Sequence, residues 1–181
     1  MKKVVFVAFV FIMLFCFCGC EMGYQDAPQI TEGEFPFVLE YEMNGQRYLI
    51  EDTVECYFDG YDKTNPFWPY YPRTWHSGLK NNSVRTFLEL EENTESVLTK
   101  GRINSESRIV LYYGHGGYYL GDPDDSDKGP CINYVENYKT SEKVTHSEVT
   151  ALTYEQLEEY FGITIIRFEF SSPIENTFIA Q

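Results

Sequence analysis

Positive charge is scarce in this chain. Its 181 residues include 14 lysines and arginines against 28 aspartates and glutamates, which gives a formal net charge of −14. Such an acidic surface repels the phosphates of nucleic acids and the headgroups of anionic lipids, because binding to either needs clustered basic side chains. Nucleic acid is therefore excluded as a partner, and a membrane attachment must come from something other than a basic patch.

The sequence also lacks the short motifs of common active sites. It has no Gly-x-Ser-x-Gly nucleophile elbow and no glycine-rich phosphate-binding loop. The run Gly114-His115-Gly116-Gly117 is similar to the oxyanion loop of lipases and esterases, but without the elbow it indicates a tight turn between two strands. No catalytic residue and no cofactor is predicted. His76 and His146 have no neighbours at metal-ligand spacing and are expected at the surface.

Cysteine is rare after residue 20, where only Cys56 and Cys131 remain. In an oxidising compartment these two residues could form a disulfide bond. Two buried free thiols are the alternative, because sequence spacing alone does not establish a bridge.

The N-terminus has the features of an export signal. Lys2 and Lys3 precede an uncharged apolar run from residue 4 to residue 17. A basic start followed by such a run is typical of a signal peptide, and the run is short for a membrane span, which needs about 20 apolar residues. Cys16 and Cys18 lie in or next to this apolar segment and are expected to act as small hydrophobic residues rather than as metal ligands.

The four residues that end this segment, Phe17-Cys18-Gly19-Cys20, resemble the bacterial lipobox, whose usual pattern is Leu-Ala/Ser-Gly/Ala-Cys. The resemblance implies a diacylglyceryl group on the Cys20 thiol and cleavage between Gly19 and Cys20, so residues 1–19 would be a lipoprotein signal peptide. Phe17 and Cys18 depart from the pattern. The alternatives are an uncleaved anchor and a signal that is cut without lipid.

The rest of the chain divides into a tether and one domain. Residues 20–34 are mostly polar and include glycine and proline, which predicts a lipidated flexible tether. Residues 35–181 are enough for a single domain. Tyrosine and phenylalanine are abundant, at 15 and 14, which favours a core rich in β-structure.

Alternating apolar residues predict several strands. Residues 35–43 alternate with a period of two, and Asn44-Gly45 then marks a hairpin turn into a partner strand at 46–51. The other expected strands are 53–59, with Cys56 facing the core, then 84–90, 108–113, 118–120 and 163–170. The expected fold is mainly β, an antiparallel sandwich-like domain with one short helix near the C-terminus, and the alternative is an open antiparallel α+β sheet.

That helix is predicted over residues 154–161. Thr153 and Gln156 have the spacing of a capping box, and Gly162 suits the position just after the last turn.

The first candidate binding site is an aromatic loop within a long segment, 62–75, that is expected at the surface. Its sequence NPFWPYYPRTW, residues 65–75, holds five aromatic residues and three prolines. Flat exposed rings could stack on sugars or peptides, and the alternative is that the rings pack back onto the sheet. The candidate residues are Trp68, Tyr70, Tyr71 and Trp75, of which Trp75 is the one most expected to be buried.

The second candidate is an acidic loop, GDPDDSDKGP, residues 121–130. Calcium prefers six to eight oxygen ligands on a flexible loop. The spacing does not match an EF-hand, because Lys128 occupies a ligand position and no glutamate closes the loop. The alternative is a hydrated acidic turn. The candidate metal ligands are Asp122, Asp124, Asp125 and Asp127.

The order of these features resembles small lipoproteins of unknown function from Gram-positive bacteria. The resemblance rests on the Asn-Gly hairpin and on the segments EDTVECYFDGY, YYGHGGYYLGD and LTYEQLEEYFGITII, and it implies no activity. The leading hypothesis is a non-enzymatic lipoprotein that is bound to the cell membrane through Cys20, faces outside the cytoplasm and binds an unknown envelope ligand or protein. An enzyme that acts on the envelope and an accessory subunit of a membrane complex are the alternatives.

Overall fold

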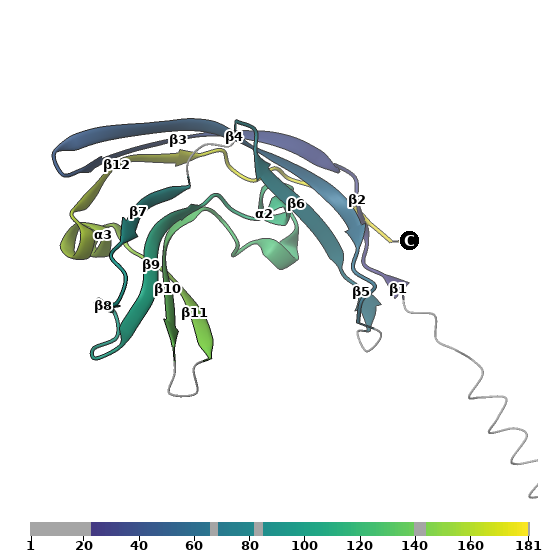
Figure 1. Cartoon of the computed structure of the whole chain (residues 1–181). Coiled ribbons are helices and arrows are strands. Elements are labelled where there is room, and N and C mark those ends of the chain that lie inside the picture. Colours follow the sequence, from purple (N-terminus) through teal and green to yellow (C-terminus); the bar gives the residue numbers. More distant parts are fainter. Residues whose placement is uncertain (1–22, 66–68, 82–84, 140–143, 181) are drawn as a thin grey trace, which may run out of the picture.

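The computed structural model describes residues 23–65, 69–81, 85–139 and 144–180. In these residues two antiparallel sheets form a sandwich-like fold, with the first sheet arching over the second (Figure 1). This confirms the prediction of a mainly β, sandwich-like domain, in place of a single open sheet.

The first sheet is built around one long hairpin. Asn44 and Gly45 join its two strands with φ angles of 53° and 73°, the positive values that the predicted tight turn requires. The strands expected at 46–51 and 53–59 are a single strand, β4. In spatial order the sheet consists of β12 (Ile163–Phe170), β3 (Glu32–Met43), β4 (Gln46–Tyr61) and β6 (Arg73–Leu79).

The second sheet contains two strands that sequence patterns did not predict, β10 and β11. In the segment that forms β10, Ile132, Tyr134 and Tyr138 alternate, but Glu136 falls on the same face and interrupts the apolar pattern. Glu136 is nevertheless buried there, because Arg102 and the Asn104 amide both donate to its carboxylate. In spatial order the sheet consists of β11 (Thr145–Ala151), β10 (Cys131–Lys139), β9 (Ile103–Tyr112) and β7 (Thr86–Leu90), and the short β8 (Thr94–Glu95) also pairs with β9.

The predicted C-terminal helix is confirmed as α3 (Tyr154–Phe161). Thr153 and Gln156 form the capping box, and Gly162 ends the helix in the left-handed conformation. The strand predicted at 118–120 is wrong. The chain there forms a single helical turn, α2 (Gly116–Tyr119), capped by His115 and followed by the 3₁₀ turn η1 (Pro123–Asp125).

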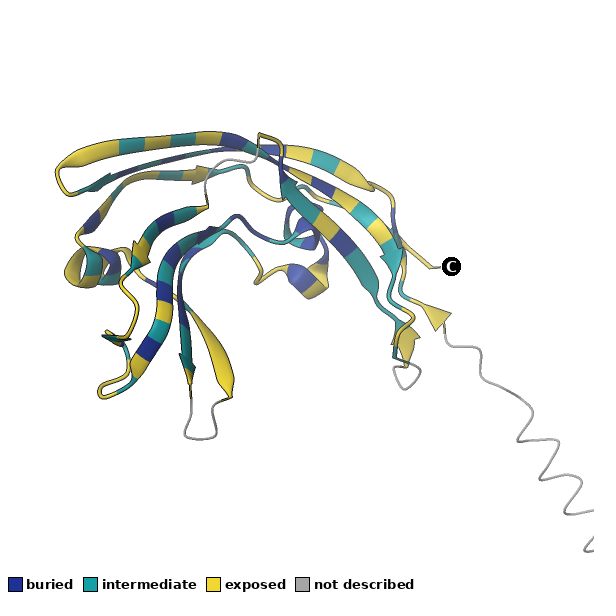
Figure 2. Ribbon diagram, in the orientation of Figure 1, coloured by how far each residue is buried: buried dark blue, intermediate teal, exposed yellow. Residues whose placement is uncertain are grey.

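Alternating side chains of β3 and β4 form much of the core between the sheets, as predicted. Phe35, Phe37 and Leu39 are at most 5% exposed, and Val54 and Cys56 join them from β4. The bands of buried and exposed residues along these strands are visible in Figure 2. No helix in the described part of the chain is long and apolar enough to cross a membrane.

The segment predicted as a flexible tether is ordered wherever the structure describes it. β1 (Gly23–Tyr24) pairs in parallel with β5 (Tyr70–Tyr71), and β2 (Ala27–Pro28) pairs with β13 (Phe178–Ile179). The part from residue 23 to residue 34 therefore belongs to the domain rather than to a tether. Residues 1–22, which include the predicted signal, Gly19 and Cys20, lie outside the described residues.

Candidate functional site

The two candidate loops of the sequence meet in space through one buried carboxylate. Asp122, which follows α2, receives hydrogen bonds from Arg73 and Trp75 of β6. Arg73 donates from Nε and Nη2 to the two Asp122 oxygens, each at 2.7 Å, and Trp75 Nε1 donates to Oδ2 at 2.7 Å. This Arg73–Asp122–Trp75 network fixes the acidic loop against the strand that follows the aromatic loop.

The network stabilises both charges although it is buried. The Arg73 and Asp122 side chains are only 6% and 3% exposed. Burial alone would raise the pKa of Asp122, but hydrogen bonds from Arg73, from the Asp124 backbone N–H and from Trp75 outweigh it and hold that pKa below its usual value. Burial likewise opposes the charge of Arg73, and Asp122 compensates, so the pKa of Arg73 is raised. The pair is therefore ionised at neutral pH.

A pocket of about 440 Å³ lies beside this network, between the first strands and the last strand of the domain. Tyr24, Tyr70 and Phe178 give it aromatic walls, and Phe178 stacks 4.5 Å from the Arg73 guanidinium. Most small-molecule sites are concave, have apolar or aromatic walls and contain a few polar groups. We call this site the aromatic pocket. It is lined by Tyr24, Gln25, Asp26, Tyr70, Arg73, Pro123 and Phe178.

The polar residues of the aromatic pocket differ in how many hydrogen bonds they already make within the protein. The Gln25 amide binds Asp124 at 2.6 Å and the Arg73 backbone N–H at 2.7 Å. Arg73 is held by Asp122 and also donates to the backbone carbonyl of Asp26 at 3.1 Å. Within the described residues the Asp26 carboxylate makes no hydrogen bond or ion pair. It is therefore the polar group that can accept hydrogen bonds from a ligand.

The predicted aromatic candidates lie in different environments. Tyr70 is 44% exposed and lines the pocket. Tyr71 is half-buried, with its ring 5.3 Å from that of Tyr24. Trp75 is buried in the core, as expected from the sequence. Trp68 lies outside the described residues. Among the described residues, the loop thus contributes Tyr70 as one wall of the site, whereas Trp75 packs into the core.

The acidic loop is held together by internal contacts. Asp125 is buried; its carboxylate accepts from Lys128 Nζ at 2.5 Å and lies 2.5 Å from His115 Nδ1. Asp124 is exposed and accepts from Gln25, and Asp127 is also exposed. Over the ranges that the structure describes, no three histidine, cysteine or acidic side chains are arranged so that they could hold a metal ion. Asp122 and Asp125 act as structural anchors, a role that differs both from the candidate calcium loop and from its alternative, a hydrated acidic turn.

His115 forms a histidine–carboxylate pair with Asp125, an arrangement that also occurs in hydrolases. A hydrolase needs a nucleophile that hydrogen-bonds to the histidine. Among the described residues, the only other hydrogen-bond partner of the His115 ring is the Gly117 backbone N–H, at 3.4 Å. The pair therefore caps α2 and fixes the loop, and it offers no complete catalytic arrangement.

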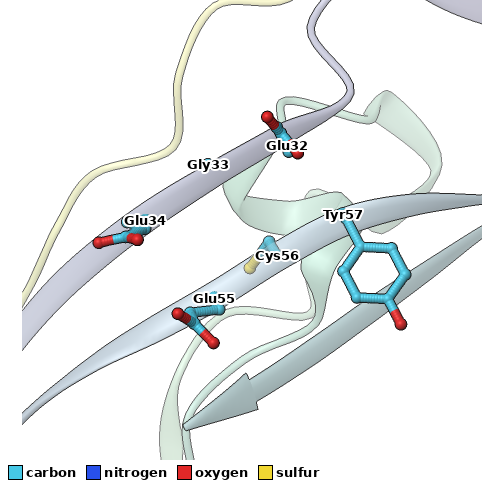
Figure 3. A pocket seen from close by; sticks show the side chains of 6 residues that line it. All are labelled: Glu32, Gly33, Glu34, Glu55, Cys56 and Tyr57. Atoms are coloured by element: carbon cyan, nitrogen blue, oxygen red, sulfur yellow. The ribbon is translucent and has the colours of Figure 1, made fainter. Parts of the chain in front are cut away.

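A larger hollow, about 490 Å³, lies on the outer face of the first sheet (Figure 3). Figure 3 shows Glu34 and Glu55 extending from the neighbouring strands β3 and β4. Lys80 lies 2.7 Å from the Glu34 carboxylate and 3.7 Å from that of Glu55. Despite its size we prefer the aromatic pocket, because half of the residues that line this hollow are glutamates and Tyr57 is the one aromatic residue among them.

The two cysteines do not form the predicted candidate disulfide. Both Cys56 and Cys131 are free thiols. Burial raises the pKa of Cys56 to about 12, so it remains protonated and is a poor nucleophile. Burial also raises the pKa of Cys131, which donates to the Asn133 side chain at 3.4 Å.

No known protein-family model matches this chain, and no curated protein sequence or solved structure matches it significantly. The functional assignment therefore depends on the geometry of the site alone.

Sequence reasoning missed most of the aromatic pocket. Tyr24 and Phe178 lie near opposite ends of the chain, and Arg73 is 49 residues from Asp122. No local spacing connects such residues. The available signal was Arg73 itself, an arginine among the aromatic residues of that loop, which needs a carboxylate partner when buried.

Proposed function

We propose that this protein is an extracytoplasmic lipoprotein, held in the cell membrane by lipid on Cys20, whose domain binds an envelope ligand in the aromatic pocket without transforming it. The observation that carries the proposal is the pocket itself, with three aromatic walls and the unengaged Asp26 carboxylate. The lipobox resemblance of residues 17–20 supports the anchor. Two or more acyl chains hold a protein stably in a bilayer.

The position of the pocket fits an anchored protein. Tyr24 lines the pocket and follows Cys20 by only four residues. Because an extended chain covers at most about 3.6 Å per residue, the pocket wall would lie within roughly 15 Å of the anchor. Its ligand would then be a component of the envelope close to the outer surface of the membrane.

The chemistry of the pocket favours a ligand with a flat apolar face and hydrogen-bond donors. Tyr24, Tyr70 and Phe178 offer ring faces, and Asp26 offers an acceptor. Sugars combine a C–H face with hydroxyl donors, and peptides combine apolar side chains with N–H groups. Polyanions are disfavoured, because the surrounding protein is acidic.

Thermal unfolding with a panel of cell-wall sugars and peptides tests this proposal. A ligand at 100 times its dissociation constant adds about 2.7 kcal/mol of stability, which raises the melting temperature by roughly 5–10 °C. We expect Tyr70→Ala to abolish the shift. Tyr57→Ala is the matched control, because Tyr57 is also 44% exposed but lines the acidic hollow. A shift that is lost in Tyr57→Ala and kept in Tyr70→Ala would place binding in the hollow instead.

A further inference from the structure

The edge strand β11 differs from the edge strands β12, β6 and β7 in the regularity of its pairing. β12, β6 and β7 each pair with their neighbour through a register shift, located between Ile165 and Arg167, between Phe58 and Tyr61, and between Thr86 and Leu88. Such bulges twist a strand and make its edge unsuitable for further pairing. β11 pairs with β10 over seven residues with no shift.

β11 is also open to solvent along its length. It is the last strand of its sheet, and six of its seven residues are exposed, as Figure 2 shows. It contains no proline and only one charged residue, Glu148. A regular, exposed edge of this kind presents a row of backbone donors and acceptors that can pair with another strand.

The hydrogen bonds between β10 and β11 show which backbone groups of β11 face away from the sheet. Leu152 N–H donates to the Ile132 carbonyl at 2.9 Å, in the same register as the β10–β11 pairs. Hydrogen-bonded and non-hydrogen-bonded pairs alternate in antiparallel strands. The backbone groups of His146 and Glu148 therefore point to β10, and those of Thr145, Ser147 and Val149 point away from the sheet.

We propose that β11 pairs antiparallel with β11 of a second copy of this chain, with Ser147 facing Ser147 on the two-fold axis. This register joins Thr145 of each copy to Val149 of the other through outward-facing backbone groups. It also places His146 opposite Glu148 twice, once on each side of the axis.

Charge favours this register over its neighbours. Centring the pair on Glu148 would place two glutamates face to face, and like charges directly opposite destabilise a sheet. Centring it on His146 would oppose two histidines and shorten the pairing. Glu148 and Glu136 share the Arg102 guanidinium, so the exposed Glu148 carboxylate keeps acceptor capacity that an imidazole N–H of the partner's His146 can use.

Disulfide trapping in the full-length protein, solubilised in mild detergent, tests the pairing. Facing hydrogen-bonded residues have Cα atoms about 5.5 Å apart, which is within the range of a disulfide. We expect Ser147→Cys to give at least about tenfold more disulfide-linked dimer than Thr164→Cys, a position that is also exposed but lies on the bulged β12. Equal yields would overturn the proposal, and so would linkage of Ser147→Cys to other proteins but not to a second copy.

The register has its own test in the Ser147→Cys background. His146→Lys places a positive charge opposite Glu148, and His146→Glu opposes it with a like charge. We expect His146→Glu to lower the dimer yield about tenfold and His146→Lys to leave it within about twofold. Equal yields in the two variants would exclude the Ser147-centred pairing. Circular dichroism of each variant checks that the fold is retained.

Discussion

Replacing Asp122 with alanine should destabilise the domain by about 3 kcal/mol, the low end for a broken buried pair, since the buried Arg73 guanidinium keeps only the exposed Asp124 carboxylate, 3.2 Å away, as a counter-charge. Trp75 Nε1 would lose its acceptor as well. Single domains are stable by only about 5–15 kcal/mol, so this change removes a large share of the total. Urea unfolding of the full-length protein in mild detergent measures it.

Asp127→Ala is the matched control, because Asp127 lies in the same loop but is exposed. It should change stability by less than about 0.5 kcal/mol. The dependence of the free energy of unfolding on acid pH provides a second check on the role of Asp122. The folded pKa of Asp122 is lowered, so its contribution is complete above its unfolded pKa of about 3.9 and is lost as pH falls through the folded value. The gap between wild type and Asp122→Ala should thus close only below about pH 4. Equal effects of the two substitutions at neutral pH would contradict the structural role of Asp122.

Gly116→Ala should destabilise the domain by about 2–3 kcal/mol, although alanine is the better helix former by about 1 kcal/mol. Gly116 begins α2, and a Cβ there would lie 2.4 Å from the backbone carbonyl oxygen of His76 on β6. That oxygen belongs to a paired strand and cannot move aside as a side chain can. Thermal and urea unfolding should therefore show a loss where helix propensity alone predicts a gain.

Gly23→Ala serves as the control for this substitution. Gly23 is exposed in β1, and an added Cβ would meet no atom within 4 Å. It should leave stability within about 0.5 kcal/mol of wild type. If Gly116→Ala stabilised the domain, α2 would not pack against β6 as described.

The features that the sequence predicted well depend on local physics. The capping box of α3 needs only Thr153 and Gln156, and the β3–β4 hairpin needs only Asn44-Gly45 between alternating strands. The features it predicted badly depend on distant partners. α2 forms at a glycine-rich stretch because its glycines allow close contact with Trp75 and His76 of β6. β10 buries a glutamate because Arg102 and Asn104 satisfy it.

The same contrast applies to the candidate site. Several of the candidate residues that the structure describes prove structural. Asp122 and Trp75 hold the Arg73–Asp122–Trp75 network together, and Tyr70 alone among the aromatic candidates in the described residues lines the pocket. The remaining walls, Tyr24 and Phe178, reach the site through strand pairings, β1 with β5 and β2 with β13, that no local pattern indicates.

The proposed lipid on Cys20 would determine where the aromatic pocket operates, and it can be measured directly. A bacterium that expresses the protein is grown with a clickable palmitate analogue, and wild type is compared with Cys20→Ala. We predict label on the wild-type protein in the membrane fraction, on the peptide that begins at Cys20, and no label on Cys20→Ala. A wild-type protein that carries no lipid, or that is labelled equally after Cys20→Ala, would contradict the anchored-lipoprotein proposal.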